Sequence, residues 1–206
     1  MRAPVVLVVT EHASHLTAAR RGRYGAIGRH LAEIAGRDVR TVHYLDADAL
    51  AAYAVVLSGA KAPWDAHEPD DLARLGEAVT TSGRPTLGIC AGLQLLAMFA
   101  GGEVRPMRES GRRPERGYLP LQVLDGVGLL EGLPPRVTVF QDHEDEITVL
   151  PEGFRVLART SGCEVQAVAD PERGWWGTQF HPERWDAEHP DGPRVLDNFF
   201  ALASGR

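Results

Sequence analysis

Short apolar segments alternate with helix-like segments along the first half of the chain, and this alternation restricts the fold more than any other feature. Segments rich in Val and Leu predict buried strands, at residues 4–10, 39–44, 53–58 and 86–89. Amphipathic or apolar segments predict helices between and after these strands, at residues 24–35, 68–81 and 91–100. Strands joined by helices of this length form a parallel sheet that is covered on both faces.

The second half of the chain has a different pattern. Short strands separated by Gly, Pro and Asp turns are predicted, most clearly at residues 137–140, 154–158, 164–168 and 176–180. A helix is predicted at 193–203, and residues 106–115 are the best candidate for a flexible loop. The chain contains no internal repeat, low-complexity segment or long linker, so we expect residues 1–206 to form one domain with a smaller β-rich extension.

Composition and charge argue against several classes of protein for this chain. The formal net charge of −6 argues against a nucleic-acid-binding surface, and we interpret the run of arginines at 105–116 as a solvated or mobile loop. No apolar run approaches the roughly 18 residues that a membrane span needs, and the first residues become acidic too soon for a signal peptide. Two cysteines without a secretion signal indicate free thiols in the cytoplasm more than a disulfide.

Cys90 lies between Gly88 and Gly92, after a predicted buried strand and before a predicted helix. A nucleophile at such a strand-to-helix elbow is held in a tight turn, and small neighbours leave room for the backbone. The positive end of the helix that begins there favours the thiolate. The amide of Ala91 could donate a hydrogen bond to an oxyanion. The elbow alone is also compatible with a buried structural cysteine, which is how we interpret Cys163.

His181 ends another apolar strand, and Glu183 follows it by two residues, so both side chains can point the same way. A thiolate–imidazole–carboxylate triad needs this arrangement, because the imidazole takes the thiol proton and the carboxylate fixes the orientation of the ring. We interpret the other histidines as turn, core or surface residues. His12 and His15 are expected to be a surface pair, and no metal site is predicted.

Segments 88–94 and 177–183, in this order, resemble the two signature motifs of the class I glutamine amidotransferases. The resemblance extends over most of the chain, and it is greatest for free-standing members similar to the glutaminase half of GMP synthetase. Further segments also resemble landmarks of this family, namely 56–60, 115–118, 142–145 and 196–200.

The resemblance implies an α/β, flavodoxin-like fold with a mostly parallel central sheet, helices on both faces, and the nucleophile at the carboxyl end of the sheet. It implies that Cys90 attacks the side-chain amide of glutamine, that His181 and Glu183 complete the triad, and that ammonia leaves behind a glutamyl thioester. Ala60 and Ala91 are the expected oxyanion donors. The residues expected to bind the rest of glutamine are Gly59, Gln94, Asp142, His143 and Asp145.

A few positions depart from the family pattern. Ala60 and Lys61 stand where many members have glycine and proline, and Glu144 stands where glycine is usual. Alanine is strained if the loop requires a positive φ there, so we expect the oxyanion donor of this loop to be misplaced until a partner protein binds. An exposed Trp175 or Trp176 would suit a docking surface for that partner.

The partner is expected to be a separate synthetase, because nothing in the chain resembles an ATP-pyrophosphatase or acceptor-substrate domain. No Gly-Lys-Ser/Thr phosphate loop occurs, and no cofactor is expected. Two alternatives stay open at this point. A γ-glutamyl hydrolase or amidase would use the same triad with water as the only acceptor, and a non-catalytic regulatory module would keep only the fold. The acceptor of the ammonia is not predicted.

Overall fold

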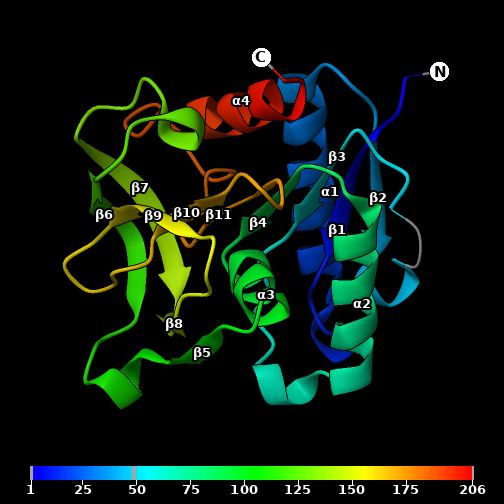
Figure 1. Ribbon diagram of the computed structural model, residues 1–206, viewed down its shortest axis with the longest axis horizontal. Coiled ribbons are helices and arrows are strands. Elements are labelled where there is room, and N and C mark those ends of the chain that lie inside the picture. The colour runs from blue at the N-terminus through cyan, green and yellow to red at the C-terminus, as the bar shows by residue number, and fades with distance from the viewer. Residues whose placement is uncertain (1, 48–49, 206) are drawn as a thin grey trace.

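The computed structural model describes residues 2–47 and 50–205, and these form one large sheet of nine strands (Figure 1). Neighbouring parallel strands make up its first part, in the order β2 (Val39–His43), β1 (Val5–Val9), β3 (Ala54–Leu57), β4 (Thr86–Ile89) and β11 (Trp175–Thr178). Antiparallel strands continue it, in the order β10 (Ala167–Asp170), β9 (Arg155–Arg159), β6 (Glu115–Val123) and β7 (Arg136–His143). The predicted α/β fold with a largely parallel sheet is confirmed, and the β-rich second half extends the same sheet.

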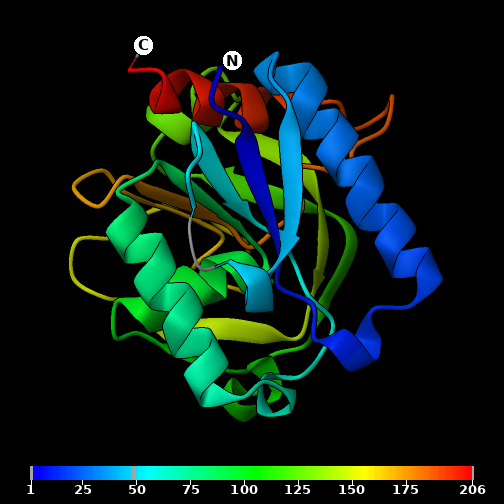
Figure 2. The same cartoon turned by 90° about the vertical axis from the view of Figure 1, so that its right-hand side faces the viewer.

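Helices cover both faces of the parallel strands (Figure 2). The core of one face is shared with α1 (Ala18–Ala35) and α4 (Gly192–Ala203), and the core of the other face with α2 (Pro69–Ser82) and α3 (Ala91–Phe99). Every residue of β1 is buried, because successive side chains alternate between these two cores. In the part of the chain that the structure describes, no helix has both the length and the apolar character needed to cross a membrane.

A second sheet of two antiparallel strands lies next to α3. It pairs β5 (Glu103–Pro106) with β8 (Asp145–Val149), and β8 follows β7 almost directly. The turn at residues 143–145 therefore connects the large sheet to the small one. Neither β5 nor β8 was predicted: β5 has only four residues and ends in a proline, and β8 begins with two acidic residues.

Several predicted boundaries differ from the structure, and those of α1 and β10 have a clear cause. Helix α1 begins at Ala18, earlier than expected, because the hydroxyl of Thr17 caps it by accepting a hydrogen bond from the amide of Arg20. The strand predicted at 164–168 is wrong over most of its length, because β10 begins only at Ala167. The preceding residues form bends, where the amide of Cys163 donates a hydrogen bond to the side chain of Thr160.

The expectation of a mobile basic loop at 106–115 is wrong for the residues that anchor it. Met107 is fully buried and begins a 3₁₀ turn, Met107–Ser110. Arg112 forms an ion pair with the buried Glu146 of β8. The sequence did not indicate this, because Met107 lies among charged residues and Glu146, the partner of Arg112, lies far along the chain.

Trp175 and Trp176 are both buried, which overturns the docking role expected for an exposed tryptophan. The Trp175 ring packs near Phe154, with ring centroids 6.4 Å apart, on the face covered by α2 and α3. The Trp176 ring packs against Phe199 of α4, with centroids 6.0 Å apart. The two rings therefore fix β11 between the two cores.

Candidate active site

Cys90 is the turn residue between β4 and α3. Its φ of 53° makes it the only non-glycine residue with a positive φ in the described ranges. Such a conformation costs about 1–3 kcal/mol and persists where the surrounding structure enforces it. A Cβ on Gly88 would lie 2.5 Å from the backbone of Gly92, and one on Gly92 would lie 2.3 Å from the carbonyl oxygen of Leu57. Helix and sheet thus approach each other too closely for any other residue, and the predicted elbow is present.

His181 lies next to Cys90 because β11 and β4 are neighbours in the sheet. The amide of Cys90 donates a hydrogen bond to the carbonyl oxygen of Thr178 over 2.7 Å, which ties the two strand ends together. Nδ1 of His181 lies 2.7 Å from Oε1 of Glu183, and both side chains are buried. A Cβ added to Gly59 would lie 3.0 Å from Cε1 of His181 and 3.4 Å from Cβ of Cys90, so the two side chains border the same small space.

The charge of His181 follows from its neighbours. Burial disfavours the imidazolium, but the Glu183 carboxylate and the Cys90 thiolate stabilise it and raise the pKa of His181 to about 10. Nε2 of His181 and Oε2 of Glu183 have no hydrogen-bond partner among the described residues. This environment favours the imidazolium form of His181, in which the Nε2 proton is free to move to a reacting atom.

The loop that carries Ala60 comes next to this pair at the end of β3. The carbonyl oxygen of Gly59 accepts hydrogen bonds from the hydroxyls of Tyr24, over 3.0 Å, and of Ser58, over 2.9 Å. Because the peptide is planar and trans, the amide of Ala60 points to the opposite side from those hydroxyls. Ala60 also has no positive φ, so the strain expected for an alanine at this position does not arise.

Glu11, which follows the end of β1, holds the other side of this loop. Its side chain is fully buried, and its carboxylate accepts hydrogen bonds from the amides of Lys61, over 3.1 Å, and Ala62, over 2.9 Å. Arg20 of α1 lies 3.4 Å from the same carboxylate. This role of Glu11 was not predicted from the sequence. A charged residue directly after a buried strand, at the carboxyl edge of a parallel sheet, was the signal that could have identified it.

A cavity of about 440 Å³ opens in front of the elbow. It is lined by residues of the elbow and α3, of the 60–65 loop, of β5 and the turn after it, and of the 142–145 segment. The cavity thus brings together most of the residues predicted to act on glutamine, namely Ala60, Cys90, Ala91, Gln94, Asp142, His143 and Asp145. Gly59 lines a smaller cavity behind His181 and Glu183.

The two aspartates of this segment differ in environment. Asp142 lies 2.6 Å from Nζ of Lys61 and 3.5 Å from Arg184. Despite partial burial, which opposes its charge, these cations lower the pKa of Asp142. Asp145 has no ion pair among the described residues, and burial together with the nearby charge of Glu144 raises its pKa. Asp145 is therefore a carboxylate of the cavity wall that forms no ion pair with a described residue, although the charge of Arg108 in the same wall acts on it.

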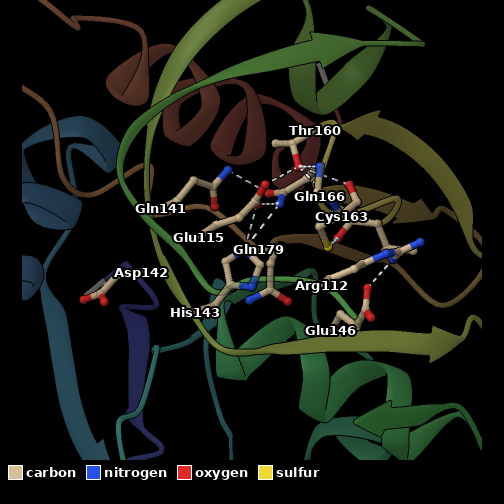
Figure 3. Close-up of polar contacts among 12 residues, drawn as sticks. Arg112, Glu115, Gln141, Asp142, His143, Glu146, Thr160, Cys163, Gln166 and Gln179 are labelled. Carbon is tan, nitrogen blue, oxygen red and sulfur yellow. Dashed lines mark hydrogen bonds and ion pairs between the residues drawn. The ribbon is translucent and has the colours of Figure 1, made fainter. Parts of the chain in front are cut away.

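The side chain of His143 does not reach into the cavity, although it was predicted to bind substrate. Its ring is buried, with Nδ1 2.9 Å from the carbonyl oxygen of Asp145 and Nε2 3.1 Å from Oε2 of Glu115 (Figure 3). Gln166 donates a second hydrogen bond to the same Glu115 oxygen over 2.6 Å. Only the backbone of His143 is left for contact with a ligand, and its ring serves to hold the 143–145 turn in place.

Cys163 belongs to this buried network and differs sharply from Cys90. Its thiol is buried, with the carbonyl oxygen of Val165 3.6 Å away, and burial raises the pKa of Cys163 to about 12. An unstrained, protonated thiol of this kind is structural. Within the described ranges, no group of three or more His, Cys, Asp or Glu side chains could hold a metal ion.

Comparison with known proteins agrees with this geometry. The family model described as "Glutamine amidotransferase class-I" matches residues 32–203. One relative, a subunit of the glutamine-hydrolyzing GMP synthase of Methanothrix thermoacetophila, is 37% identical over 133 residues, which cover 65% of this chain and 70% of that protein. A glutamine-hydrolyzing GMP synthase of Thermus thermophilus is 40% identical over 153 residues, which cover 74% of this chain but only 28% of that protein.

A solved structure is similar over the whole chain. The protein comes from Thermoplasma acidophilum and is provisionally named as a subunit of GMP synthase; it is 28% identical and has a TM-score of 0.81. The superposition covers 100% of this chain and 96% of that one. A glutamine amido transferase from Methylobacillus flagellatus shares the fold, with a TM-score of 0.72 at 18% identity.

Proposed function

The chain belongs to the class I glutamine amidotransferase family, and we propose that it hydrolyses the side-chain amide of glutamine and supplies the ammonia to a separate synthetase. The observation that carries the proposal is the strained Cys90 elbow, which lies beside the buried His181–Glu183 pair at the edge of the cavity. A structural cysteine would need neither the strain nor the charged pair.

The Cys90 thiolate attacks the amide carbon of glutamine, and the carbonyl oxygen becomes an oxyanion. The amide of Ala91, at the first turn of α3, and the amide of Ala60 are the proposed donors to this oxygen. His181 gives its Nε2 proton to the amide nitrogen, ammonia leaves, and a γ-glutamyl thioester remains on Cys90. Water then loses a proton to His181 and attacks the thioester, so that glutamate and the thiolate are released. Glu183 orients the ring throughout.

The proposed substrate contacts use the far wall of the cavity. Asp145 is suited to the α-ammonium group of glutamine, because its carboxylate lines the cavity and forms no ion pair with a described residue. Arg108 lies in the same wall and offers a cation for the α-carboxylate. Asp142 is already paired with Lys61, so we propose that its role is to shape the entrance of the cavity. Gly59 has no side chain and so leaves room beside Cys90 and His181. Gln94, on α3, forms part of the cavity floor.

The partner is proposed from the lengths of the relatives. The aligned part of this chain spans only 28% of the Thermus GMP synthase, whereas the Methanothrix relative carries the name of a subunit. We therefore propose that the ammonia-consuming chemistry belongs to a second polypeptide of the GMP synthase kind. Two free cysteines, one of them the proposed nucleophile, support a reducing compartment such as the cytoplasm.

The decisive experiment measures ammonia released from free glutamine by the purified chain. A Cys90→Ala variant is the control, and a bulky γ-glutamyl anilide is the competing substrate. Glutamine hydrolysis that depends on Cys90 and exceeds anilide hydrolysis supports the proposal. Equal or faster hydrolysis of the anilide would point instead to a γ-glutamyl hydrolase. The proposed partner is tested by adding the synthetase component of a two-polypeptide GMP synthase. The free ammonia should then fall, because the synthetase consumes it.

A further inference from the structure

Two buried glutamines connect the cavity floor to the sulfur of Cys90. Gln94 lies on α3, one turn after the elbow, and Gln179 lies directly after β11. Neither side chain is exposed by more than 3%. Nε2 of Gln94 donates hydrogen bonds to the carbonyl oxygen of Asp145, over 3.2 Å, and to Oε1 of Gln179, over 3.0 Å. Nε2 of Gln179 lies 3.5 Å from Sγ of Cys90.

The orientation of both side-chain amides follows from the carbonyl oxygen of Asp145, which can only accept hydrogen bonds. The carbonyl oxygen of Asp145 has no hydrogen to donate, so the group that faces it on Gln94 must be the NH₂. The same NH₂ faces Gln179, so the group it meets there must be the carbonyl oxygen. The NH₂ of Gln179 is then left to face Cys90. Turning the Gln179 amide over would place two NH₂ groups against each other in a buried site, without acceptors.

Resting on the proposed role of Cys90 as nucleophile, we propose that Gln179 is a catalytic residue that donates an N–H···S hydrogen bond to the Cys90 thiolate, and that Gln94 is the positioning residue that fixes its orientation. The bond stabilises a charged sulfur more than a neutral thiol. It acts before glutamine arrives and holds Sγ in place while the His181 proton stays available. Gln94 thus supports the nucleophile through Gln179, and it also forms part of the cavity floor.

The contact between Gln179 and Cys90 is fixed by the backbone of Gln179 as well as by its side chain. The backbone amide of Gln179 donates to the carbonyl oxygen of Gln166 over 2.8 Å, so the main chain is held as well as the side chain. The other titratable groups around the sulfur are His181 and Glu183 on one side and, in the lining of the cavity, Lys61, Asp65, Arg108, Asp142, His143, Glu144 and Asp145. None of these is altered by exchanging Gln179, so a change in thiolate formation can be assigned to the lost donor.

The test is the pH dependence of Cys90 alkylation by iodoacetamide without glutamine, read by mass spectrometry of the Cys90 peptide. Gln179→Met keeps the length and removes the donor, and we expect the midpoint of alkylation to rise by about one pH unit. Gln179→Glu keeps the shape and adds negative charge, so its midpoint should rise further. Gln94→Met should give a smaller rise, because the Gln179 amide then loses its fixed orientation.

Gln141→Met is the matched control. Gln141 is equally buried and donates to Oε1 of Gln166 over 2.9 Å, without touching Cys90. Its variant should keep the wild-type midpoint. An unchanged midpoint in both Gln179 variants, or the same rise in the Gln141 variant, would overturn the inference. A wild-type chain that alkylates with a low midpoint but does not hydrolyse glutamine would overturn the proposed function and leave the hydrogen bond standing.

Discussion

Glu11 accepts a hydrogen bond from the amide of Lys61 over 3.1 Å, although nothing in the sequence links the end of β1 to the loop after β3. Together with the contacts of Tyr24 and Ser58 to the Gly59 carbonyl, this bond fixes the peptides on both sides of Ala60. Burial and the charge of Glu11 raise the pKa of Tyr24, so the phenol keeps its hydrogen. These contacts hold the oxyanion loop from within this chain, and the flipped peptide expected from the sequence stays a prediction.

Exchange of Glu11 should therefore reduce turnover more than substrate binding. In Glu11→Gln, one of the two acceptors becomes an NH₂ that faces a backbone amide, at a cost of about 1–3 kcal/mol. We expect the loop to shift and kcat to fall about 10- to 100-fold, with KM nearly unchanged. The measurement is steady-state glutamine hydrolysis at a temperature where the variant is folded.

Asp170→Asn provides the matched control for that experiment. Asp170 is also a fully buried carboxylate that pairs with an arginine and accepts a backbone amide, here that of Arg173. It lies at the other end of the sheet, where β10 pairs with the start of β11. The control should lose stability but keep kcat. Equal losses of kcat in both variants would mean that Glu11 acts only on stability.

Cys90 and Cys163 should differ strongly in reactivity. A glutamine-like chloroketone should label Cys90 at least about 100-fold faster than Cys163 at neutral pH, because burial raises the pKa of Cys163 to about 12 and leaves almost no thiolate there. Mass spectrometry of the two peptides provides the rates. Label found mainly on Cys163 would contradict the assignment of the nucleophile.

The triad partners should differ in the size of their effects. We expect His181→Ala to abolish turnover, since the departing ammonia loses its proton donor. Glu183→Gln should retain about 10²-fold more activity than His181→Ala, because the oxygen of the amide can still orient Nδ1. Steady-state ammonia release compares the two. A fully inactive Glu183→Gln beside an active His181→Ala would reverse the roles.

Titration of His181 should appear in the stability of the chain. Its pKa is raised from 6.5 to about 10 on folding, so protonation stabilises the folded state below pH 6.5, and this stabilisation is lost as the pH rises towards 10. The free energy of unfolding of wild type minus that of His181→Gln should therefore fall across this window. Chemical denaturation at several pH values measures it. In Glu183→Gln the loss should be smaller and complete at a lower pH, because the carboxylate that raises the pKa of His181 most is gone.

The elbow and the histidine strand could be predicted from the sequence because their signals are local. Glycines on both sides of Cys90 and a carboxylate two residues after His181 are readable without knowing what lies nearby in space. The alternation of strands and helices predicted the parallel half of the sheet for the same reason. Each of these features depends on residues within one strand–turn–helix unit or one strand end.

The groups that support these residues could not be predicted in this way. Glu11, Tyr24 and Gln179 act on partners in other elements, and each is an ordinary polar residue in its own segment. His143 was predicted to bind substrate and does border the cavity, but its ring points to Glu115, which only the pairing of β6 with β7 brings close. Met107 shows the reverse case, since a run of charged neighbours concealed a core residue.

Lys61 provides the last prediction, because its ammonium group contacts Asp142 on the other side of the cavity. Its Nζ lies 2.6 Å from Oδ1 of Asp142 and 3.0 Å from the carbonyl oxygen of the same residue, so the side chain joins two walls of the cavity. Both side chains are partly exposed, at 37% and 23%, and such pairs contribute about 0.2–1 kcal/mol and weaken with salt.

We therefore expect Lys61→Met to raise KM for glutamine about two- to fivefold, with kcat nearly unchanged, because the 142–145 wall is less well held before the substrate binds. In the wild type, KM should rise with added salt, and the variant should lose this dependence. Arg74→Met is the control, since Arg74 forms an exposed ion pair with Asp71 on α2, away from the cavity. If KM and its salt dependence are the same in wild type and Lys61→Met, the ion pair does not hold the wall, and the position of Asp142 must be set by the backbone of β7.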